Sequence, residues 1–309
     1  VCYQVRMFGS SETGWRIRPP FELPVIYEDD HFALVNKPAG VVTYKQGNSV
    51  SGDALLSVRA ALPFVLSPPK IGTYSIMRRP ASVHRLDKPT SGLLVNAKTK
   101  PAMMNLCQQF HDRVIRKTYL AIVNGIPEER FEESISSKDA AKLGVDVDPQ
   151  SDALWQVIDF SLDGKQSVTV WRALQYTRSL HAKDETLTFV ELKPKTGRHH
   201  QLRRHLAWVC NTPIVGDKKY DGGEPASLKF RNNGMFLCAS RVVLEHPHFN
   251  TPGGRQEWKS LPEEKKRGIV WEREDGTLMV TANIDVPDKF SSLMEREADR
   301  YEKLHELPA

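Results

Sequence analysis

The sequence lacks several features that mark specialised classes of protein. No apolar run in its 309 residues approaches the roughly 20 residues that a membrane-spanning helix needs, so no membrane partner is expected. The cysteines lie far apart and form no C-x-x-C pair, which argues against the dense disulfide framework of small secreted domains. We therefore expect reduced, buried thiols and an intracellular protein, in the cytoplasm or in an organelle. The four cysteines are Cys2, Cys107, Cys210 and Cys238.

Motifs of common nucleotide-binding and hydrolytic sites are also absent. The chain contains neither G-x-x-x-x-G-K-[ST] nor G-x-G-x-x-G, so a nucleotide cofactor is not expected. It contains no G-x-S-x-G elbow of a serine esterase. Its first residue is Val1, which is compatible with an upstream segment having been removed.

The residues that are present describe an ordinary globular protein with an uneven distribution of charge. Hydrophobic residues make up 40% of the chain and charged residues 26%, and the net charge is +5. Basic residues gather in one region together with three histidines, which suits a polyanionic partner, although a solvated helix face would look similar. These basic residues are Arg198, Arg203, Arg204, Lys218 and Lys219.

The chain divides by composition into a core and two flanking parts. We predict an N-terminal extension over residues 1–22, a catalytic domain over 23–250 and a charged C-terminal segment over 251–309 that ends in a helix. Within the core, residues 127–153 are acidic and weakly patterned, and are expected to form a surface insertion. Hairpin-like strands with isolated helices between them indicate an α+β fold.

The stretch "SVHRLDKPTSGLLVNAKTK" places Asp87 just before an apolar run. Pro89 and Gly92 disfavour a helix, so Arg85 and Asp87 are expected on one side of an extended or turning segment and Leu86 on the other. By itself, such an aspartate is most often a turn residue.

Two further elements frame this stretch. After it, Thr99 is positioned to cap a helix whose packing face is expected to carry Met103, Leu106, Cys107 and Phe110. Next, "VIRKTYLAIVNG" predicts a strand with Tyr119, Ala121 and Val123 on one side. A tyrosine in a strand is usually core, but a phenol near an ionised aspartate could also transfer a proton or stack on a base.

The segment "KTGRHHQLRRHL" predicts a helix from His199 to Val209 with a buried stripe of Leu202, Leu206 and Val209. Its histidines at 199, 200 and 205 do not converge on one helix face, which argues against a zinc site. Arg203 lies at the margin of the stripe, where it could reach a buried acid. Arg204 lies about 200° from Leu202 and is expected to face solvent or phosphate.

Taken together, these motifs resemble the RluA-type RNA pseudouridine synthases. The resemblance rests on "VIYEDDHFALVNKPAGVV", "HRLDKPTSGLLVNAKT", "RKTYLAIVNG", "LKPKTGRHHQLRRHLAWVCNTPIVGDKKY" and "LCASRVVLEHP", which follow one another in the order of the family and cover roughly residues 24–247. It implies an α+β pseudouridine synthase fold, with a central, largely antiparallel or mixed sheet, flanking helices and a basic active-site cleft.

The resemblance also implies the reaction and its residues. Uridine in rRNA or tRNA would be isomerised to its C-glycoside, without a cofactor or a metal. Asp87 would be the catalytic aspartate, Tyr119 would line the pocket against uracil, and Arg203 would pair with Asp87. Arg85 would displace the target base and fill its place. Further contacts to RNA or to the base are expected from His84, Arg198, His200, Gln201 and Arg204.

The sequence departs from the family pattern in three places. Pro89 follows the motif lysine, and His199 stands where a small hydroxyl residue is more usual. The residues before the first strand are too few for an S4 RNA-binding domain, so affinity for RNA would come from the catalytic face, the appended segments or a protein partner. We expect a monomer.

Two other functions remain as alternatives. The first is a non-catalytic RNA-binding or ribosome-assembly protein on the same scaffold, and a hydrolase with one carboxylate is a weaker one.

Overall fold

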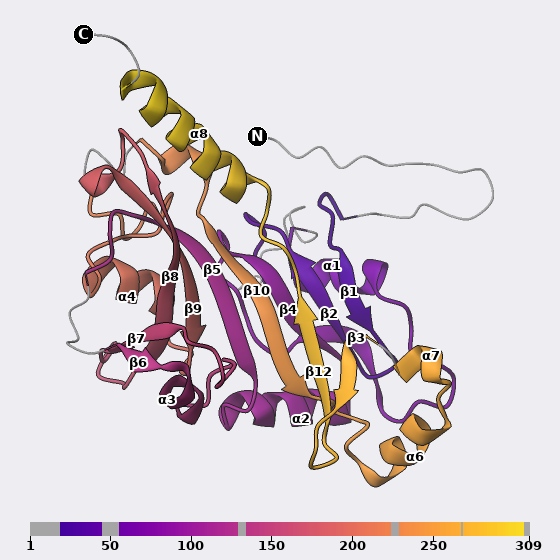
Figure 1. Cartoon of the computed structure of the whole chain (residues 1–309). Coiled ribbons are helices and arrows are strands. Elements are labelled where there is room, and N and C mark those ends of the chain that lie inside the picture. The colour runs from indigo at the N-terminus through magenta and orange to yellow at the C-terminus, as the bar shows by residue number, and fades with distance from the viewer. Residues whose placement is uncertain (1–18, 45–55, 129–133, 224–228, 267, 306–309) are drawn as a thin grey trace, which may run out of the picture. The chain divides into compact units, whose positions relative to one another are not determined.

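The computed structural model describes residues 19–44, 56–128, 134–223, 229–266 and 268–305, and the chain folds as two compact units (Figure 1). Unit 1 lies within residues 1–115 and 243–284, and unit 2 within residues 116–242 and 285–309. The expected division into an extension, a core and a C-terminal segment stays a prediction, and residues 1–18 of that extension, with Cys2, lie outside the described residues.

Unit 1 is centred on a buried strand. All nine residues of β4 (Ser91–Thr99) are buried, and β4 pairs antiparallel with β2 (Phe32–Lys37) from Phe32↔Ala97 to Lys37↔Gly92. Strand β1 (Val25–Glu28) adds to β2, and β3 (Ile76–Ser82) adds to β4 with an irregular register. The apolar run that follows Asp87 is therefore a central strand, as its composition suggests.

Unit 1 also contains helices and two further strands. Helix α2 (Lys100–His111) is capped by the Thr99 hydroxyl and packs on β4. Leu106 is buried as expected, but Cys107 is exposed, so the predicted buried thiol is wrong at this position. The other elements of unit 1 are α1 (Val58–Val65), α6 (Pro252–Ser260), α7 (Glu263–Lys266), β11 (Val270–Glu272) and β12 (Leu278–Asn283).

Unit 2 contains an antiparallel sheet in the order β5-β9-β8-β7, with short β6 pairing to β7. Strand β10 begins in unit 2 and ends in unit 1. The bounds are β5 (Arg116–Asn124), β6 (Ile135–Ser136), β7 (Leu154–Asp159), β8 (Val168–Arg178), β9 (Thr186–Pro194) and β10 (Leu237–Glu245).

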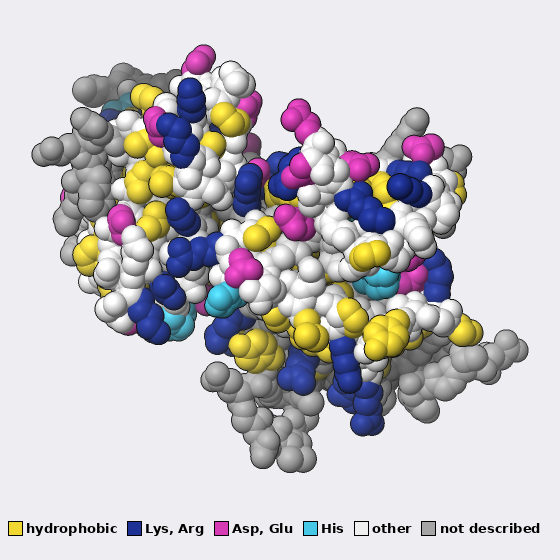
Figure 2. Space-filling model, turned by 90° about the horizontal axis from the view of Figure 1, so that it is seen from below, with side chains coloured by type: hydrophobic (Ala, Val, Ile, Leu, Met, Phe, Trp, Pro, Cys, Tyr) yellow, Lys and Arg dark blue, Asp and Glu magenta, His cyan; other side chains and the backbone are white. Residues whose placement is uncertain are grey.

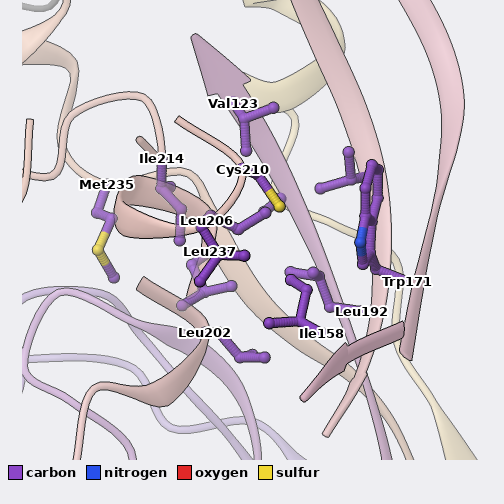
Figure 3. Packing of buried hydrophobic residues seen from close by; sticks show 13 residues of the cluster. Val123, Ile158, Trp171, Leu192, Leu202, Leu206, Cys210, Ile214, Met235 and Leu237 are labelled. Carbon is purple, nitrogen blue, oxygen red and sulfur yellow. The ribbon is translucent and has the colours of Figure 1, made fainter. Parts of the chain in front are cut away.

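One hydrophobic cluster joins this sheet to α4 (Gln201–Trp208), as Figure 3 shows. Leu202, Leu206 and Val209 all belong to it, which confirms the predicted stripe. From β5 it takes Ala121 and Val123, against which Tyr119 packs on the same side of the strand. The helix begins two residues later than predicted because His200 has a left-handed backbone, with φ 52°, and forms the N-cap.

The acidic segment over 127–153 is more ordered than a plain surface insertion. Helix α3 (Ser137–Lys142) is capped by the Ser136 hydroxyl, and its Ala140 is fully buried in a small cluster with Val145 and Trp155. Residues 129–133 of the segment lie outside the described residues. The segment was hard to interpret because its few apolar residues follow no regular period.

The chain ends in α8 (Lys289–His305), which buries Phe290, Leu293 and Met294. The Phe290 ring lies 5.2 Å from that of Phe236, between ring centroids. Unit 2 also contains two short 3₁₀ helices, Lys183–Glu185 and Arg231–Asn233. Within the described ranges, no helix combines the length and the apolar character that crossing a membrane would require. Sheets with helices packed on them confirm the α+β class.

Candidate active site

The H-R-L-D motif lies in the loop that leads from β3 into β4. Asp87 begins a tight turn in which its carbonyl accepts a hydrogen bond from the Thr90 amide at 3.1 Å. Arg85 is exposed, Leu86 is 5% exposed and Asp87 is half-buried, so the alternation predicted for the motif is correct. The carboxylate of Asp87 thus lies next to an anchored leucine at the entrance to a buried strand.

Two side chains hold this loop, one from the end of β2 and one from the segment after it. The buried Thr43 hydroxyl donates to the Leu86 carbonyl at 3.1 Å, and the Leu86 amide donates back to it at 3.2 Å. The ammonium of Lys37, which is 0% exposed, donates to the carbonyls of Pro38 and Val41 at 3.0 and 2.8 Å. It also lies 3.4 Å from the Lys88 carbonyl, beside Asp87.

Lys37 is a buried cation close to the candidate catalytic carboxylate. Burial lowers the pKa of Lys37 from 10.5 to about 8, and the charge of Asp87 counteracts part of that shift. Lys37 belongs to the motif "VIYEDDHFALVNKPAGVV", but no role was predicted for it. The sequence signal for Lys37 was a charged residue two positions after the apolar run Ala33-Leu34-Val35 and directly before a proline.

The two motif residues before Leu86 make different contacts. The Val95 amide donates to Nε2 of His84 at 3.0 Å, so this nitrogen carries no proton, and the His84 ring lies 4.7 Å from that of Phe110. His84 is thus tied to β4 and α2. The Arg85 guanidinium lies 5.6 Å from the centre of the Tyr44 ring and remains exposed to a ligand.

In unit 2, Arg203 projects from α4 into the protein. Its guanidinium makes two hydrogen bonds to the carboxylate of Asp217, Nε to Oδ2 at 2.6 Å and Nη2 to Oδ1 at 2.7 Å. Arg203 is 6% exposed and Asp217 is 1% exposed. Arg203 therefore reaches a buried acid, as its place on the helix suggested, but this acid was not singled out in the sequence. Its pairing with Asp87 stays a prediction.

The orientation predicted for Arg204 is wrong. Arg204 is 7% exposed and forms two hydrogen bonds to Asp163, both at 2.8 Å, while its guanidinium lies 4.7 Å from the centre of the Trp208 ring. The bond to Asp163 raises the pKa of Arg204 above its ordinary value. The loop between β7 and β8, which carries Asp163, covers this side of the helix.

Gln201 is also engaged within the protein. Its carbonyl oxygen accepts from the Thr196 hydroxyl at 2.6 Å and from the Arg198 amide at 3.0 Å. Its amide nitrogen donates to the Val168 carbonyl and the Thr169 hydroxyl. With 4% exposure, Gln201 fixes the turn before α4 and has little capacity left for RNA.

An aromatic and basic group surrounds Tyr220 in unit 2. The Tyr220 hydroxyl lies 2.9 Å from Nδ1 of His200, and its ring lies near Trp208, 5.6 Å between centroids. The cations of Arg203 and Lys219 lie 5.0 and 5.4 Å from the ring centre. On the face shown in Figure 2, Lys and Arg side chains form several separate groups with acidic ones between them. Aromatic rings with cations beside them can stack on bases and contact phosphates, so this local group is a better indication of RNA binding than the modest net charge of the chain.

The predicted site residues thus fall into two sets. His84, Arg85 and Asp87 belong to unit 1, and the others belong to unit 2. Those of unit 2 are Tyr119, Arg198, His200, Gln201, Arg203 and Arg204. Four residues for which the sequence predicted no role form hydrogen bonds that fix these sets. Lys37 and Thr43 bind the backbone around the motif loop in unit 1, and Asp163 and Asp217 bind the arginines of α4 in unit 2.

Comparison with known proteins gives a consistent result. The model of the RNA pseudouridylate synthase family matches residues 31–208. Ribosomal large subunit pseudouridine synthase D of Neisseria meningitidis serogroup B is 34% identical over 253 residues, which cover 80% of this chain and 60% of that protein. tRNA pseudouridine synthase C of Vibrio parahaemolyticus is 30% identical over 240 residues, which cover 75% of this chain and 88% of that protein.

The fold comparison agrees with the sequence comparison. The structure of human RNA pseudouridylate synthase domain containing 4 matches with a TM-score of 0.55 at 21% identity, over 88% of this chain and 92% of that one. The chain spans 60–64% of the length of several curated relatives that it matches. By its motifs, its family match and its fold, the chain belongs to the RNA pseudouridylate synthase family, as the resemblance predicted.

Proposed function

We propose that the chain isomerises uridine to pseudouridine in rRNA or tRNA, with Asp87 as the catalytic carboxylate. The observation that carries this proposal is the construction of the Asp87 loop. Its backbone is bonded to Thr43 and to the ammonium of Lys37, and it leads into a fully buried strand. Such anchoring presents a half-buried carboxylate in a fixed position, which catalysis requires.

The reaction needs one reactive carboxylate and a pocket that keeps the detached uracil bound. It does not need several acids and bases. The bond between N1 and C1′ breaks, the uracil turns, and a bond forms between C5 and C1′. An ionised carboxylate can attack the sugar or the base, or assist elimination at the sugar. Asp87 fits any of these roles. Tyr119 would line the pocket and move a proton, and Arg203 would orient Asp87.

A stacked uridine hides the atoms that react, so the nucleotide must leave the stack. Unstacking costs a few kcal/mol, which an inserted side chain offsets. Arg85 suits this role because it is exposed, follows His84 in an anchored loop and has a planar, cationic head group.

Contacts to the rest of the RNA would come from the group around Tyr220 and from the basic residues beside it. Arg198 is half-buried, and Lys218 and Lys219 are exposed. Arg204 and Gln201 are left out of this set, because both are buried, the Arg204 guanidinium is paired with Asp163 and the Gln201 amide binds protein groups. The names of the relatives give both ribosomal and transfer RNA as candidates for the substrate.

The experiment uses unmodified transcripts of large-subunit rRNA and of tRNA from the same source, with pseudouridine mapped after incubation. Asp87→Asn should abolish modification and retain RNA binding, because it removes the charge of the carboxylate and almost no volume. Asp112→Asn, which makes the same change at the C-terminus of α2, should modify RNA at the wild-type rate.

Two results would count against the proposal. Near-normal turnover by Asp87→Asn would remove the catalytic role of Asp87. Wild-type protein that binds both RNAs and modifies neither would favour the alternative, a non-catalytic RNA-binding or ribosome-assembly protein. Modification of only one transcript would decide between rRNA and tRNA.

A further inference from the structure

Three side chains that can ligate a metal meet in unit 1, although they come from separate segments. His31 lies in the turn before β2, His248 in the turn after β10, and Glu257 in α6. Each offers one ligand atom, and these atoms all lie within 4.8 Å of one another. The two imidazole rings are stacked, with their centroids 3.6 Å apart, and Nε2 of His248 lies 2.8 Å from Oε2 of Glu257.

The backbone beneath these side chains is well fixed. The His31 amide donates to Oδ1 of Asp29 at 2.6 Å. The His248 carbonyl accepts from both the amide and the hydroxyl of Thr251, each at 2.8 Å, and Thr251 caps α6. A Cβ at Gly254 would lie 2.1 Å from the His248 carbonyl oxygen, so only glycine allows α6 to come this close.

We propose that His31, His248 and Glu257 bind a divalent transition metal of the zinc class. Two imidazole nitrogens and one carboxylate oxygen are a donor set that such ions favour. In a tetrahedral site with metal–ligand distances near 2.1 Å, ligand atoms lie about 3.4 Å apart. The His248–Glu257 separation is 2.8 Å and no two of the three ligand atoms lie more than 4.8 Å apart, so small rotations of these half-exposed side chains would bring all three to this spacing.

The surroundings suit an ion that keeps at least one water ligand. His31 and Glu257 also line a cavity of about 620 Å³. Its other carboxylates are engaged elsewhere. Glu28 pairs with Lys98 at 2.7 Å, and Asp30 pairs with Lys70 at 3.1 Å. Asp29 lies 2.8 Å from Nε2 of His246. Three protein ligands leave an open position, and the cavity provides space for water in that position.

The metal site is distinct from the Asp87 loop. His31 precedes Phe32 at one end of the β2–β4 pair, while Lys37 contacts the Asp87 loop at the other end. At about 3.4 Å per residue, the two ends lie roughly 17 Å apart. A metal here would join the turn before β2 to the turn after β10 and to α6, and so would stabilise unit 1.

The test is titration of the full-length, metal-free protein with Zn²⁺ by calorimetry, with Co²⁺ as a spectroscopic probe. Wild type should bind one ion per chain, show the visible absorption of nitrogen-ligated Co²⁺ and melt at a higher temperature with Zn²⁺. His31→Ala, His248→Ala and Glu257→Gln should each weaken binding at least about tenfold. Glu257→Gln keeps the size of a half-exposed side chain, so it should fold like wild type.

The matched control is His111→Ala. His111 lies next to Asp112, with Nδ1 and Oδ1 2.9 Å apart, and so forms a histidine–carboxylate pair without a second histidine. Its loss should leave Zn²⁺ binding unchanged. Absence of binding by wild type, or equal binding by wild type and the variants at 31, 248 and 257, would overturn the proposal and leave a hydrogen-bonded histidine stack. None of these readouts depends on pseudouridine formation.

Discussion

Buried charges hold the segments that carry the motifs. Lys37 is bonded to carbonyls around the Asp87 loop, and Arg203 is bonded to Asp217 beneath the Tyr220 ring. An unpaired buried charge is costly, so each of these groups is stabilised by strong local partners. Their effect should be seen in both stability and its dependence on pH.

Lys37→Met gives the first prediction. The folded state lowers the pKa of Lys37 to about 8, so the unfolded chain binds more protons between pH 8 and 10.5. The contribution of Lys37 to stability must therefore rise with pH across this window, by about 3 kcal/mol in all. Relative to Lys37→Met, wild type should gain this amount in urea unfolding between pH 7.5 and 10.5. A difference between the two proteins that does not change with pH would contradict the shift.

Asp217→Ala gives the second prediction. It leaves the buried Arg203 guanidinium without its bidentate partner, so we expect a loss of about 3–5 kcal/mol in the free energy of unfolding, measured by urea denaturation followed by tryptophan fluorescence. Lys142→Ala breaks the exposed pair with Asp139 and should cost less than about 0.5 kcal/mol. A cost below about 1 kcal/mol for Asp217→Ala would mean that the pair is not important for stability.

The residues of the site were predictable where a motif or a helical period identified them. The alternation of Arg85, Leu86 and Asp87 was correct, because Pro89 and Gly92 limit the backbone. Asp217 was not predicted, because nothing in a single sequence pairs it with Arg203 across fourteen positions. Buried ion pairs of this kind depend on tertiary contacts, which local patterns do not encode.

At the scale of elements, the hydrophobic period of helix α4 predicted its buried residues but not the exposure of its other side. The period placed Leu202, Leu206 and Val209 in the core. It did not predict the loop with Asp163, which covers Arg204. A helical period predicts on which side of the helix a side chain lies. Whether that side is exposed depends on segments that are distant in the sequence.

The turn at Gly216 gives a prediction at this scale. Gly216 has φ +77°, and a Cβ there would lie 1.9 Å from the Gly234 carbonyl oxygen. Gly164 has a similar φ, +70°, and an open surrounding. Gly164→Ala should therefore cost about 1 kcal/mol from the backbone alone. Gly216→Ala should cost several kcal/mol, since the backbone of two turns must separate.

Thermal and urea unfolding of the two glycine variants tests this difference. Equal costs would show that the left-handed backbone, and not the close approach of Gly234, is the reason for glycine at position 216.

At the scale of the whole molecule, recognition of RNA should depend on where the charge lies more than on its sum. The net charge is only +5, and the described face in Figure 2 shows basic groups separated by acidic ones. Phosphate contacts release counterions, so each contact contributes about 0.7–0.9 to the slope of log K against log salt.

The last prediction follows from this relation. The double variant Lys218→Ala/Lys219→Ala should bind RNA more weakly at low salt and reduce the slope by about 1.4–1.8, measured by fluorescence anisotropy at several salt concentrations. The matched control is Lys138→Ala/Lys142→Ala, which removes two exposed lysines from α3 in the same unit and should leave the slope unchanged. Equal slopes for the two double variants would exclude Lys218 and Lys219 as phosphate contacts.

The discontinuous course of the chain has a consequence for biosynthesis. Unit 1 begins within residues 1–115 and is completed only by residues 243–284, so the whole of residues 116–242 is made in between. At 5–20 residues per second, this interval lasts roughly 6 to 25 s. During that time β4 has been made but β10, which pairs with it, has not, so part of the edge of β4 stays uncovered. An uncovered strand edge is prone to wrong pairing and is a target for a ribosome-bound chaperone.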